Sequence, residues 1–413
     1  MMKRILLICL LIVARVGSAA SAIAPPGLLP TSHARALLDQ DPSVAAARAG
    51  LEVALQEAGI LDQSPYEWTA RAASQQRRQE GGSRYSEWNV GIEKTLRLPA
   101  KATADRNIAQ STIAESRARY GRVLLGTARE LMEAWVEWLA AERAQALAQK
   151  NLQAVQASLA AVERRTRAGD ASKLDLSIAR AELAEQRRME NDAKTQTAVA
   201  WSRLSTRFPG ISRQVTVLPM PEAIDQDASY WQKRILEQSD ELKLSQVQMQ
   251  KAAAQAERAR AEKIPDPTLG VYTASEVGGR ERVSGITISI PIPGGARASS
   301  SAKAIAAVEV SRQEAEHKRR QVEADIAAAV AMAKGSYESL QIAGESAIAM
   351  QENARLMQRA YELGEAELQA LLLARRQAIT ATTNALLAQV VALKSYYGLL
   401  VDAHLIWDLG HDK

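Results

Sequence analysis

Hydrophobic residues recur at helical spacing through most of this chain, and prolines separate the helical stretches from shorter segments. Because proline breaks helix interiors, the proline-free stretches 100–208, 222–264 and 294–413 are predicted to form long helices. Within them, apolar residues follow the alternating three- and four-residue spacing of a coiled-coil seam. Two such seams are Leu152, Val155, Leu159 and Val162, and Leu386, Val390, Leu393, Tyr397 and Leu400.

Two glycines interrupt this helical pattern. Gly169 and Gly364 stand where a helix C-terminus and a tight reversal of the chain are expected. The helix that precedes the first glycine would be about 100 Å long at 1.5 Å per residue. Each outer stretch is therefore predicted to form a helical hairpin, at 100–208 in the first half and 296–409 in the second.

The segments near the prolines alternate between apolar and polar residues with a period of two, which is typical of β-strands. From Gly285 to Pro293, every second residue is isoleucine, and the residues between include Gly, Thr and Ser. The same alternation surrounds Trp88. The sequence therefore predicts two β-hairpins, at about 65–98 and 266–293, with strands of about ten residues.

The chain repeats itself at an offset of about 195 residues. Residues 91–99 match 285–293, and Gly169-Asp170 matches Gly364-Glu365. An internal duplication of this size indicates that each half holds one helix, one β-hairpin and one helical hairpin. The predicted divisions are a signal peptide at 1–24, a first structural repeat at 25–208, a linker at 209–228 and a second structural repeat at 229–409.

The predicted strands have the length that a membrane-spanning β-strand needs, about 9–11 residues. Four charged residues lie opposite the apolar face, where a water-filled lumen would be: Glu67, Arg71, Glu87 and Glu93. Three aromatic residues are candidates for a membrane girdle: Tyr66, Trp68 and Trp88. Four strands cannot close a barrel. A spanning protein would therefore be an oligomer, with eight strands from two chains or twelve from three; the alternative is a pair of edge hairpins packed on soluble helices.

The N-terminal segment has the composition of a secretory signal peptide. Lys3 and Arg4 precede an apolar run, and Ala20-Ser21-Ala22 fits a cleavage pattern. Cleavage near Ala24 would remove the single cysteine, Cys9, and three positive charges, lowering the net charge from +5 to +2. That charge is too small to indicate a nucleic-acid-binding face.

The sequence contains no pattern that indicates catalysis, a cofactor or a resident metal ion. Its four histidines are scattered, without the paired spacing of a zinc site: His33, His317, His404 and His411. No glycine-rich phosphate loop precedes a helix, and most carboxylates accompany Lys or Arg on helical surfaces. We therefore expect a protein that is not an enzyme.

The duplication and its motifs resemble the TolC-type outer-membrane efflux family, over nearly the whole chain from Thr31 to Leu409. The motifs are Asp41-Pro42 with Pro65, Gly169-Asp170-Ala171-Ser172-Lys173-Leu174-Asp175 and Tyr361-Glu362-Leu363-Gly364. Two further motifs are most similar to the heavy-metal (cobalt–zinc–cadmium) resistance branch: Leu98-Pro99-Ala100-Lys101 and Ile290-Pro291-Ile292-Pro293.

This resemblance implies a mainly α-helical fold in which helical hairpins form a periplasmic tunnel. A 12-stranded transmembrane β-barrel would be shared by a homotrimer in the outer membrane. It also implies two partners: a periplasmic adaptor (membrane fusion protein) and an inner-membrane transporter of the resistance-nodulation-division type. Docking and gating residues are expected at the periplasmic tips: Gly169, Asp170, Asp175, Tyr361, Gly364, Glu365 and Glu367.

One part of the family pattern is missing. Family members often carry acidic residues six and nine positions after the second tip glycine, and here Ala370 and Leu373 occupy those positions. Asp175 matches at the first tip. The expected function is passive export, with heavy-metal cations as the favoured substrates and drugs or other small molecules left open. The alternatives are a soluble periplasmic coiled-coil adaptor and a cytoplasmic helical scaffold.

Overall fold

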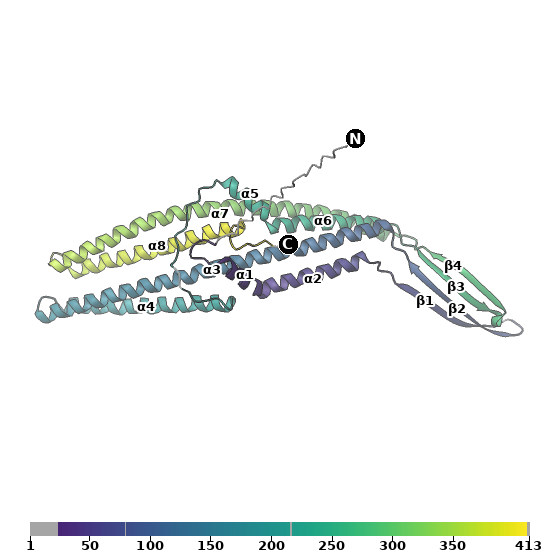
Figure 1. Ribbon diagram of the computed structural model, residues 1–413, viewed down its shortest axis with the longest axis horizontal. Coiled ribbons are helices and arrows are strands. Elements are labelled where there is room, and N and C mark those ends of the chain that lie inside the picture. Colours follow the sequence, from purple (N-terminus) through teal and green to yellow (C-terminus); the bar gives the residue numbers. More distant parts are fainter. Residues whose placement is uncertain (1–23, 79, 215–216, 411–413) are drawn as a thin grey trace, which may run out of the picture.

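The computed structural model describes residues 24–78, 80–214 and 217–410, so residues 1–23 of the expected signal peptide lie outside the described part. The molecule is elongated, with long paired helices at one end and a small sheet at the other (Figure 1). The first half contains α1 (Thr31–Gln40), α2 (Pro42–Asp62), α3 (Pro99–Ala168) and α4 (Lys173–Arg207). The second contains α5 (Ala228–Gln238), α6 (Asp240–Ala261), α7 (Gly295–Leu363) and α8 (Leu368–Asp402).

The two halves correspond element by element. The long helices α3 and α7 have 70 and 69 residues, and α4 and α8 each have 35. At 1.5 Å per residue, α3 spans about 105 Å. The chain packs α3 against α4 and α7 against α8, which makes the two predicted helical hairpins, while α2 and α6 extend along the other half of each long helix (Figure 1).

Local sequence explains where these helices begin and end. Asp41 caps α2, because its carboxylate accepts hydrogen bonds from the amides of Ser43 (2.9 Å) and Val44 (3.4 Å), and Pro42 occupies the first helical position. Gly169 and Gly364 end α3 and α7 with φ values of 89° and 81°. A side chain is strained at such angles, so glycine suits both reversals.

The two β-hairpins form one antiparallel sheet in the order β1-β2-β3-β4. The strands are β1 (Trp68–Arg78), β2 (Arg84–Thr95), β3 (Thr268–Glu276) and β4 (Glu281–Ser289), and a 3₁₀ turn, η1 (Val277–Gly279), joins the last two. The predicted alternation continues to Ile292, but β4 ends at Ser289, so Ile290 and Ile292 lie after the strand. The proline at 291 cannot donate to a strand ladder, which explains the earlier end.

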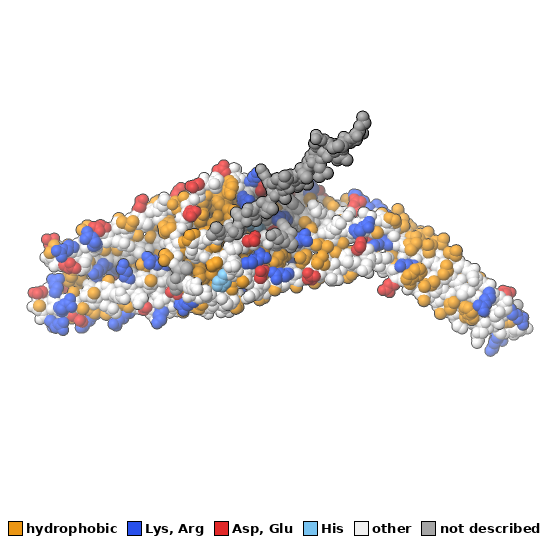
Figure 2. Space-filling view, viewed as in Figure 1, with side chains coloured by type: hydrophobic (Ala, Val, Ile, Leu, Met, Phe, Trp, Pro, Cys, Tyr) orange, Lys and Arg blue, Asp and Glu red, His pale blue; other side chains and the backbone are white. Residues whose placement is uncertain are grey.

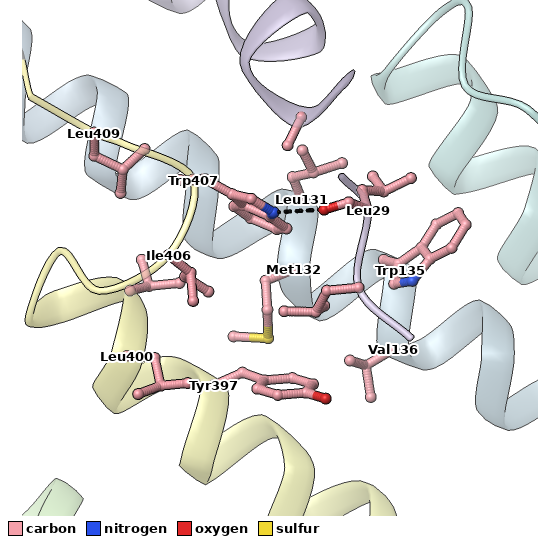
Figure 3. Close-up of a cluster of buried hydrophobic side chains, with 14 of the residues drawn as sticks. Leu29, Leu131, Met132, Trp135, Val136, Tyr397, Leu400, Ile406, Trp407 and Leu409 are labelled. Carbon is pink, nitrogen blue, oxygen red and sulfur yellow. Dashed lines mark hydrogen bonds between the residues drawn. The ribbon is translucent and has the colours of Figure 1, made fainter. Parts of the chain in front are cut away.

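The largest core lies halfway along the helices, where the two described ends of the chain meet α3 and α8 (Figure 3). Met132 of α3 faces Tyr397 of α8, and the segment after α8 adds Trp407 (Figure 3). The indole of Trp407 donates to the carbonyl of Leu29 at 2.9 Å. This core joins both repeats into one body.

Among the described helices, α8 alone has the length and mean hydropathy (1.2) of a membrane-crossing segment. Part of its apolar surface packs on neighbouring helices: Leu393 and Tyr397 belong to the central core, and Leu371 belongs to a second cluster near the hairpin reversals. We therefore assign α8 to the helical bundle. The fold is mainly α-helical with a four-stranded β part, as predicted.

Candidate functional site

The sheet has one apolar face and one polar face, and the register of the strands defines both. Ile92 lies between Ala70 and Val271, which pairs in turn with Ile286. All four residues therefore share a face, and it is exposed in the single chain. Figure 2 shows hydrophobic side chains over much of the sheet. The members of the apolar face are Trp68, Ala70, Ala72, Trp88, Val90, Ile92, Leu269, Val271, Ile286 and Ile288.

The opposite face carries charge, and three of the four predicted lumen residues lie on it. Arg71 pairs with Glu93 at 2.6 Å. Glu87 lies 3.0 Å from Arg77, and its carboxylate also accepts from the amide of Val277 at 3.3 Å, which ties η1 to β2. The fourth predicted residue, Glu67, precedes β1 and is exposed.

Two of the three girdle candidates lie on the apolar face. Trp68 and Trp88 are 63% and 38% exposed. The ammonium of Lys94 stands 5.1 Å from the ring centre of Trp68. Tyr66 differs, because it precedes β1 and its hydroxyl donates to Asp266 at 2.7 Å. That bond raises the pKa of Tyr66 to about 12 and fixes the ring where sheet and helices meet.

A buried ionic network at this junction was not predicted from the sequence. Lys101, near the start of α3, is 0% exposed and lies 3.0 Å from Asp266 and 3.3 Å from Glu262. Arg297, near the start of α7, also pairs with Glu262, at 2.8 Å. The network therefore joins the starts of both long helices to the segment that enters β3.

The electrostatics of this junction keep its acids ionised. Burial alone would raise the pKa of Asp266, but the Leu98 amide, the Tyr66 hydroxyl and Lys101 together lower it. Burial likewise opposes ionisation of Glu262, and ion pairs with Arg258 and Lys101 lower its pKa overall. Buried charges need such partners, because an unpaired charge in the interior is costly.

The first hairpin tip is built by backbone and capping hydrogen bonds. Asp170 donates its amide to the carbonyl of Arg165 at 2.8 Å, which closes the reversal after Gly169. Ser172 then caps α4. Its hydroxyl accepts from the amide of Asp175 at 3.0 Å, and the Asp175 carboxylate accepts from the amide of Ser172 at 3.1 Å. Asp175 therefore completes a capping box, which the spacing Ser-x-x-Asp could have indicated.

The second tip lacks such a cap. Glu365 donates its amide to the carbonyl of Ala360 at 2.9 Å after Gly364. Glu367 occupies the N-cap of α8 and makes no side-chain capping bond. Both glutamates are exposed, as are Ala370 and Leu373. The exposed acids that follow the reversal are thus Glu365 and Glu367, and the two family positions present an apolar surface.

Two polar contacts and a small core join the tips to each other. Val162 of α3 and Leu371 of α8 belong to one buried cluster with Ala179, Leu368 and Leu372. The Arg165 guanidinium stands 5.0 Å from the ring centre of Tyr361. Further along, Glu182 of α4 pairs with Arg376 of α8 at 2.8 Å. These two pairs could not be predicted from sequence patterns, because their members lie nearly 200 residues apart.

Comparison with known proteins agrees with this geometry. The family model described as outer membrane efflux protein matches residues 34–207 and 231–399. No curated protein sequence matches the chain. Similar solved structures include a membrane protein from Pseudomonas aeruginosa, with a TM-score of 0.76 and 18% identity over 92% of this chain and 91% of that one.

Two further structures are named channels or channel-forming proteins. CusC, whose structures concern transmembrane channel formation, has a TM-score of 0.74 and 16% identity over 93% of this chain and 97% of that one. The open state of the MtrE outer membrane channel of Neisseria gonorrhoeae has a TM-score of 0.73 and 19% identity over 92% of this chain and 90% of that one. These likenesses support the fold, and the family match covers more than half of the chain. The chain therefore belongs to the outer membrane efflux protein family, whose members are outer-membrane channels that extend into the periplasm.

Proposed function

We propose that the protein is a passive exit duct that works as a homotrimer. The observation that carries this proposal is the sheet, whose apolar face is exposed and whose edges are open. Among the described strands, β1 pairs only with β2, and β4 pairs only with β3. Open strand edges are not tolerated in lipid. Three copies would join edge to edge into a barrel of twelve strands, with the apolar faces toward lipid.

The charged face would then line the lumen. Arg71, Glu87 and Glu93 project from it, and Glu67 stands just below the first strand. Their ion pairs keep these side chains against the wall, which favours a water-filled passage over a closed plug. Trp68 and Trp88 are the remaining girdle candidates, since Tyr66 is hydrogen-bonded at the junction. The helices would continue the passage through the periplasm.

The hairpin tips would be the region where partners dock and the passage opens. The partners are a periplasmic adaptor and an inner-membrane transporter of the resistance-nodulation-division type, which supplies the energy. We assign docking and gating to Gly169, Asp170, Asp175, Tyr361, Gly364, Glu365 and Glu367. Because Arg165 lies against Tyr361 and Glu182 pairs with Arg376, opening would require these contacts between the hairpins to separate.

The proposed substrates are heavy-metal cations. The support is the resemblance of the two proline motifs to the heavy-metal branch, together with exposed carboxylates at the second tip, Glu365 and Glu367. A strain that lacks the gene should lose resistance to cobalt, zinc or cadmium salts and recover it with the wild-type gene. Unchanged metal resistance with new sensitivity to dyes or antibiotics would assign the duct to organic substrates.

The duct itself is tested by purification and conductance. We expect detergent-dependent extraction, a heat-modifiable trimer and stable ion conductance in planar lipid bilayers. The alternative, a soluble coiled-coil adaptor, predicts extraction without detergent and no conductance. The family match does not favour that alternative.

A further inference from the structure

Three arginines lie on the apolar face of the sheet, in the half farthest from the helices. Arg78 is the last residue of β1 and Arg84 is the first of β2, and the register places them directly opposite each other. Arg282 of β4 pairs with Ser275, which pairs with Trp88 on the same face. All three arginines are exposed. We call them the arginine rim, and Figure 2 shows basic side chains gathered at this end.

The rim lacks acidic partners. The carboxylates of the strands, Glu87, Glu93, Glu276 and Glu281, belong to the opposite face by register. Glu80, in the turn between β1 and β2, forms no ion pair with a described residue. Arg71 and Arg77, on that face, are both ion-paired. Within residues 24–78, 80–214 and 217–410, by contrast, no rim arginine forms an ion pair. Charge is therefore sorted by face, with unneutralised cations on the apolar side.

This arrangement costs stability unless an anion is present. Like charges directly opposite on neighbouring strands are destabilising, and Arg78 faces Arg84. Among the described residues, one rim arginine contacts an aromatic ring: the guanidinium of Arg282 stands 5.7 Å from the ring centre of Trp88. That contact holds one guanidinium at the border of the apolar band. An external anion at the same border would offset the repulsion.

The position of the rim matches the boundary of a membrane. Lys94, over Trp68, marks the end of the apolar face nearest the helices, and Arg84 lies ten residues away on β2. Ten residues of strand span about 34 Å, or about 26 Å across the membrane for a strand tilted by about 40°. The apolar band of outer-membrane barrels is about 25 Å tall. Arg78 and Arg84 therefore lie at the level of the outer-leaflet headgroups, and Arg282, level with Trp88, lies four residues nearer the helices at the border of the apolar band.

We propose that the arginine rim binds the phosphates of a phosphorylated glycolipid in the outer leaflet. Guanidinium groups bind phosphate through paired hydrogen bonds, and the acyl chains of the same lipid would cover Val90 and Ile286 below. This inference rests on the proposed function, because it requires the apolar face to lie in the outer membrane. In a trimer, each copy would present one such site.

The test measures binding of lipid A to the purified full-length trimer in mixed micelles. The probes are lipid A with two phosphates, the same lipid after dephosphorylation, and inorganic phosphate as competitor. Three arginines near an anionic surface predict a preference for the phosphorylated lipid on the order of a hundredfold. The triple variant R78Q/R84Q/R282Q should lose that preference, and R78K/R84K/R282K should keep most of it.

A matched control removes the same charge elsewhere. Arg117 and Arg143 of α3 and Arg187 of α4 are exposed, and R117Q/R143Q/R187Q should retain the full preference. An unchanged preference in the rim glutamine variant would overturn the proposal. Displacement of the lipid by inorganic phosphate at equal concentration would also overturn it, because the rim would then be a site for free anions.

Conductance of the same preparations separates this inference from the duct. A wild-type trimer that conducts in planar bilayers but binds both lipids equally overturns the arginine rim as a lipid site and leaves the duct intact. A trimer that does not conduct overturns the proposed function. Conductance by the R78Q/R84Q/R282Q variant would show that a lost lipid preference does not reflect a misfolded barrel.

Discussion

Glu182 and Arg376 form an ion pair of 2.8 Å that joins the two helical hairpins near their tips. The pair is asymmetric, because Glu182 is 5% exposed while the Arg376 side chain reaches solvent. Gln186 also donates to Glu182, at 3.1 Å. Separating the hairpins would leave a carboxylate without its cation, so this pair favours the closed arrangement.

We expect Arg376→Gln to weaken this contact and favour separation of the tips. Removing one partner from a buried pair is destabilising, and the exposure of Arg376 reduces the effect to roughly 1–2 kcal/mol. Single-channel conductance of the variant in planar bilayers should rise, or its open periods should lengthen. Glu352→Gln is the matched control, because Glu352 pairs within α7, with Arg355 at 2.7 Å. Equal conductance of the wild type and Arg376→Gln would remove this pair from gating.

Asp175 could act by capping α4 or by attracting cations at the entrance of the passage, and the two roles predict different results. If its main role is to cap α4, Asp175→Ala and Ser172→Ala should each cost about 1 kcal/mol in thermal stability, with little further loss in the double variant. Cation preference should then stay the same in all three. If Asp175 acts in the pore, Asp175→Asn shifts cation preference while Ser172→Ala does not. Reversal potentials in asymmetric salt distinguish the two roles.

The acids of the second tip allow a test of whether charge at the tips affects cation preference. Glu365 and Glu367 are exposed, and neither makes a capping bond through its side chain. We expect the double variant Glu365→Gln with Glu367→Gln to reduce cation preference at low salt, with a smaller effect at high salt because exposed charges are screened. A preference that does not change with either substitution or salt would contradict a role for these acids at the entrance.

Periodicity predicted the elements because each depends on neighbours in sequence. The alternation around Trp88 and the helical seam through Val162 follow from which residues must face apolar surroundings. Glycines at 169 and 364 marked the reversals for the same local reason. Periodicity did not predict where β4 ends. The alternation continues through Ile290 and Ile292, but the strand stops at Ser289, before Pro291.

Contacts between distant residues could not be predicted in this way. Tyr66 is an aromatic residue next to a strand, as a girdle residue would be. Its hydrogen-bond partner, Asp266, lies 200 residues away, so the sequence pattern could not indicate that bond. From its sequence context, Lys101 would be expected on the solvent-exposed side of a helix. The fold instead buries it completely beside acids of the second repeat. Asp175 is the opposite case. Its capping partner Ser172 lies three residues away, so its structural role was visible locally.

The junction network predicts a loss of stability in acid. The pKa values of Asp266 and Glu262 are lowered from ordinary values of 3.8 and 4.5. The ionised acids therefore stabilise the fold fully above about pH 5, and this contribution is lost as the pH falls through 4.5 and below. Thermal unfolding between pH 7 and 3 should show a smaller acid-induced loss in Asp266→Asn than in the wild type. The control Asp225→Asn, at an exposed linker position, should follow the wild type.

Lys101 gives a second test of the same network. Lys101→Met removes a cation that is 0% exposed and leaves Asp266 with only neutral donors, Tyr66 and the amide of Leu98. Breaking a buried pair in this way costs roughly 3–5 kcal/mol. The double variant Lys101→Met with Asp266→Asn should recover part of that loss. A stability of Lys101→Met equal to the wild type at pH 7 would mean that the network does not hold the sheet to the helices.

Tyr272 and Gly285 define the last prediction, which concerns the charged face of the sheet. A Cβ atom on Gly285 would lie 2.7 Å from Cε1 and 2.8 Å from Oη of Tyr272, so the ring occupies the space above this glycine. The two residues pair directly between β3 and β4. Gly285→Ala would force the ring away from the wall. We expect lower single-channel conductance and a stability loss of about 1–3 kcal/mol from overpacking.

Two further variants identify the cause. Adding Tyr272→Ala to Gly285→Ala should restore conductance, because the displaced ring is then absent. Gly344→Ala in α7, where a Cβ would meet nothing within 4 Å, should leave conductance unchanged and raise stability by roughly 0.5–1 kcal/mol through helix propensity. If Gly285→Ala conducts as well as Gly344→Ala, the Tyr272 ring does not determine the width of the passage, and the polar face of the sheet has room for both side chains.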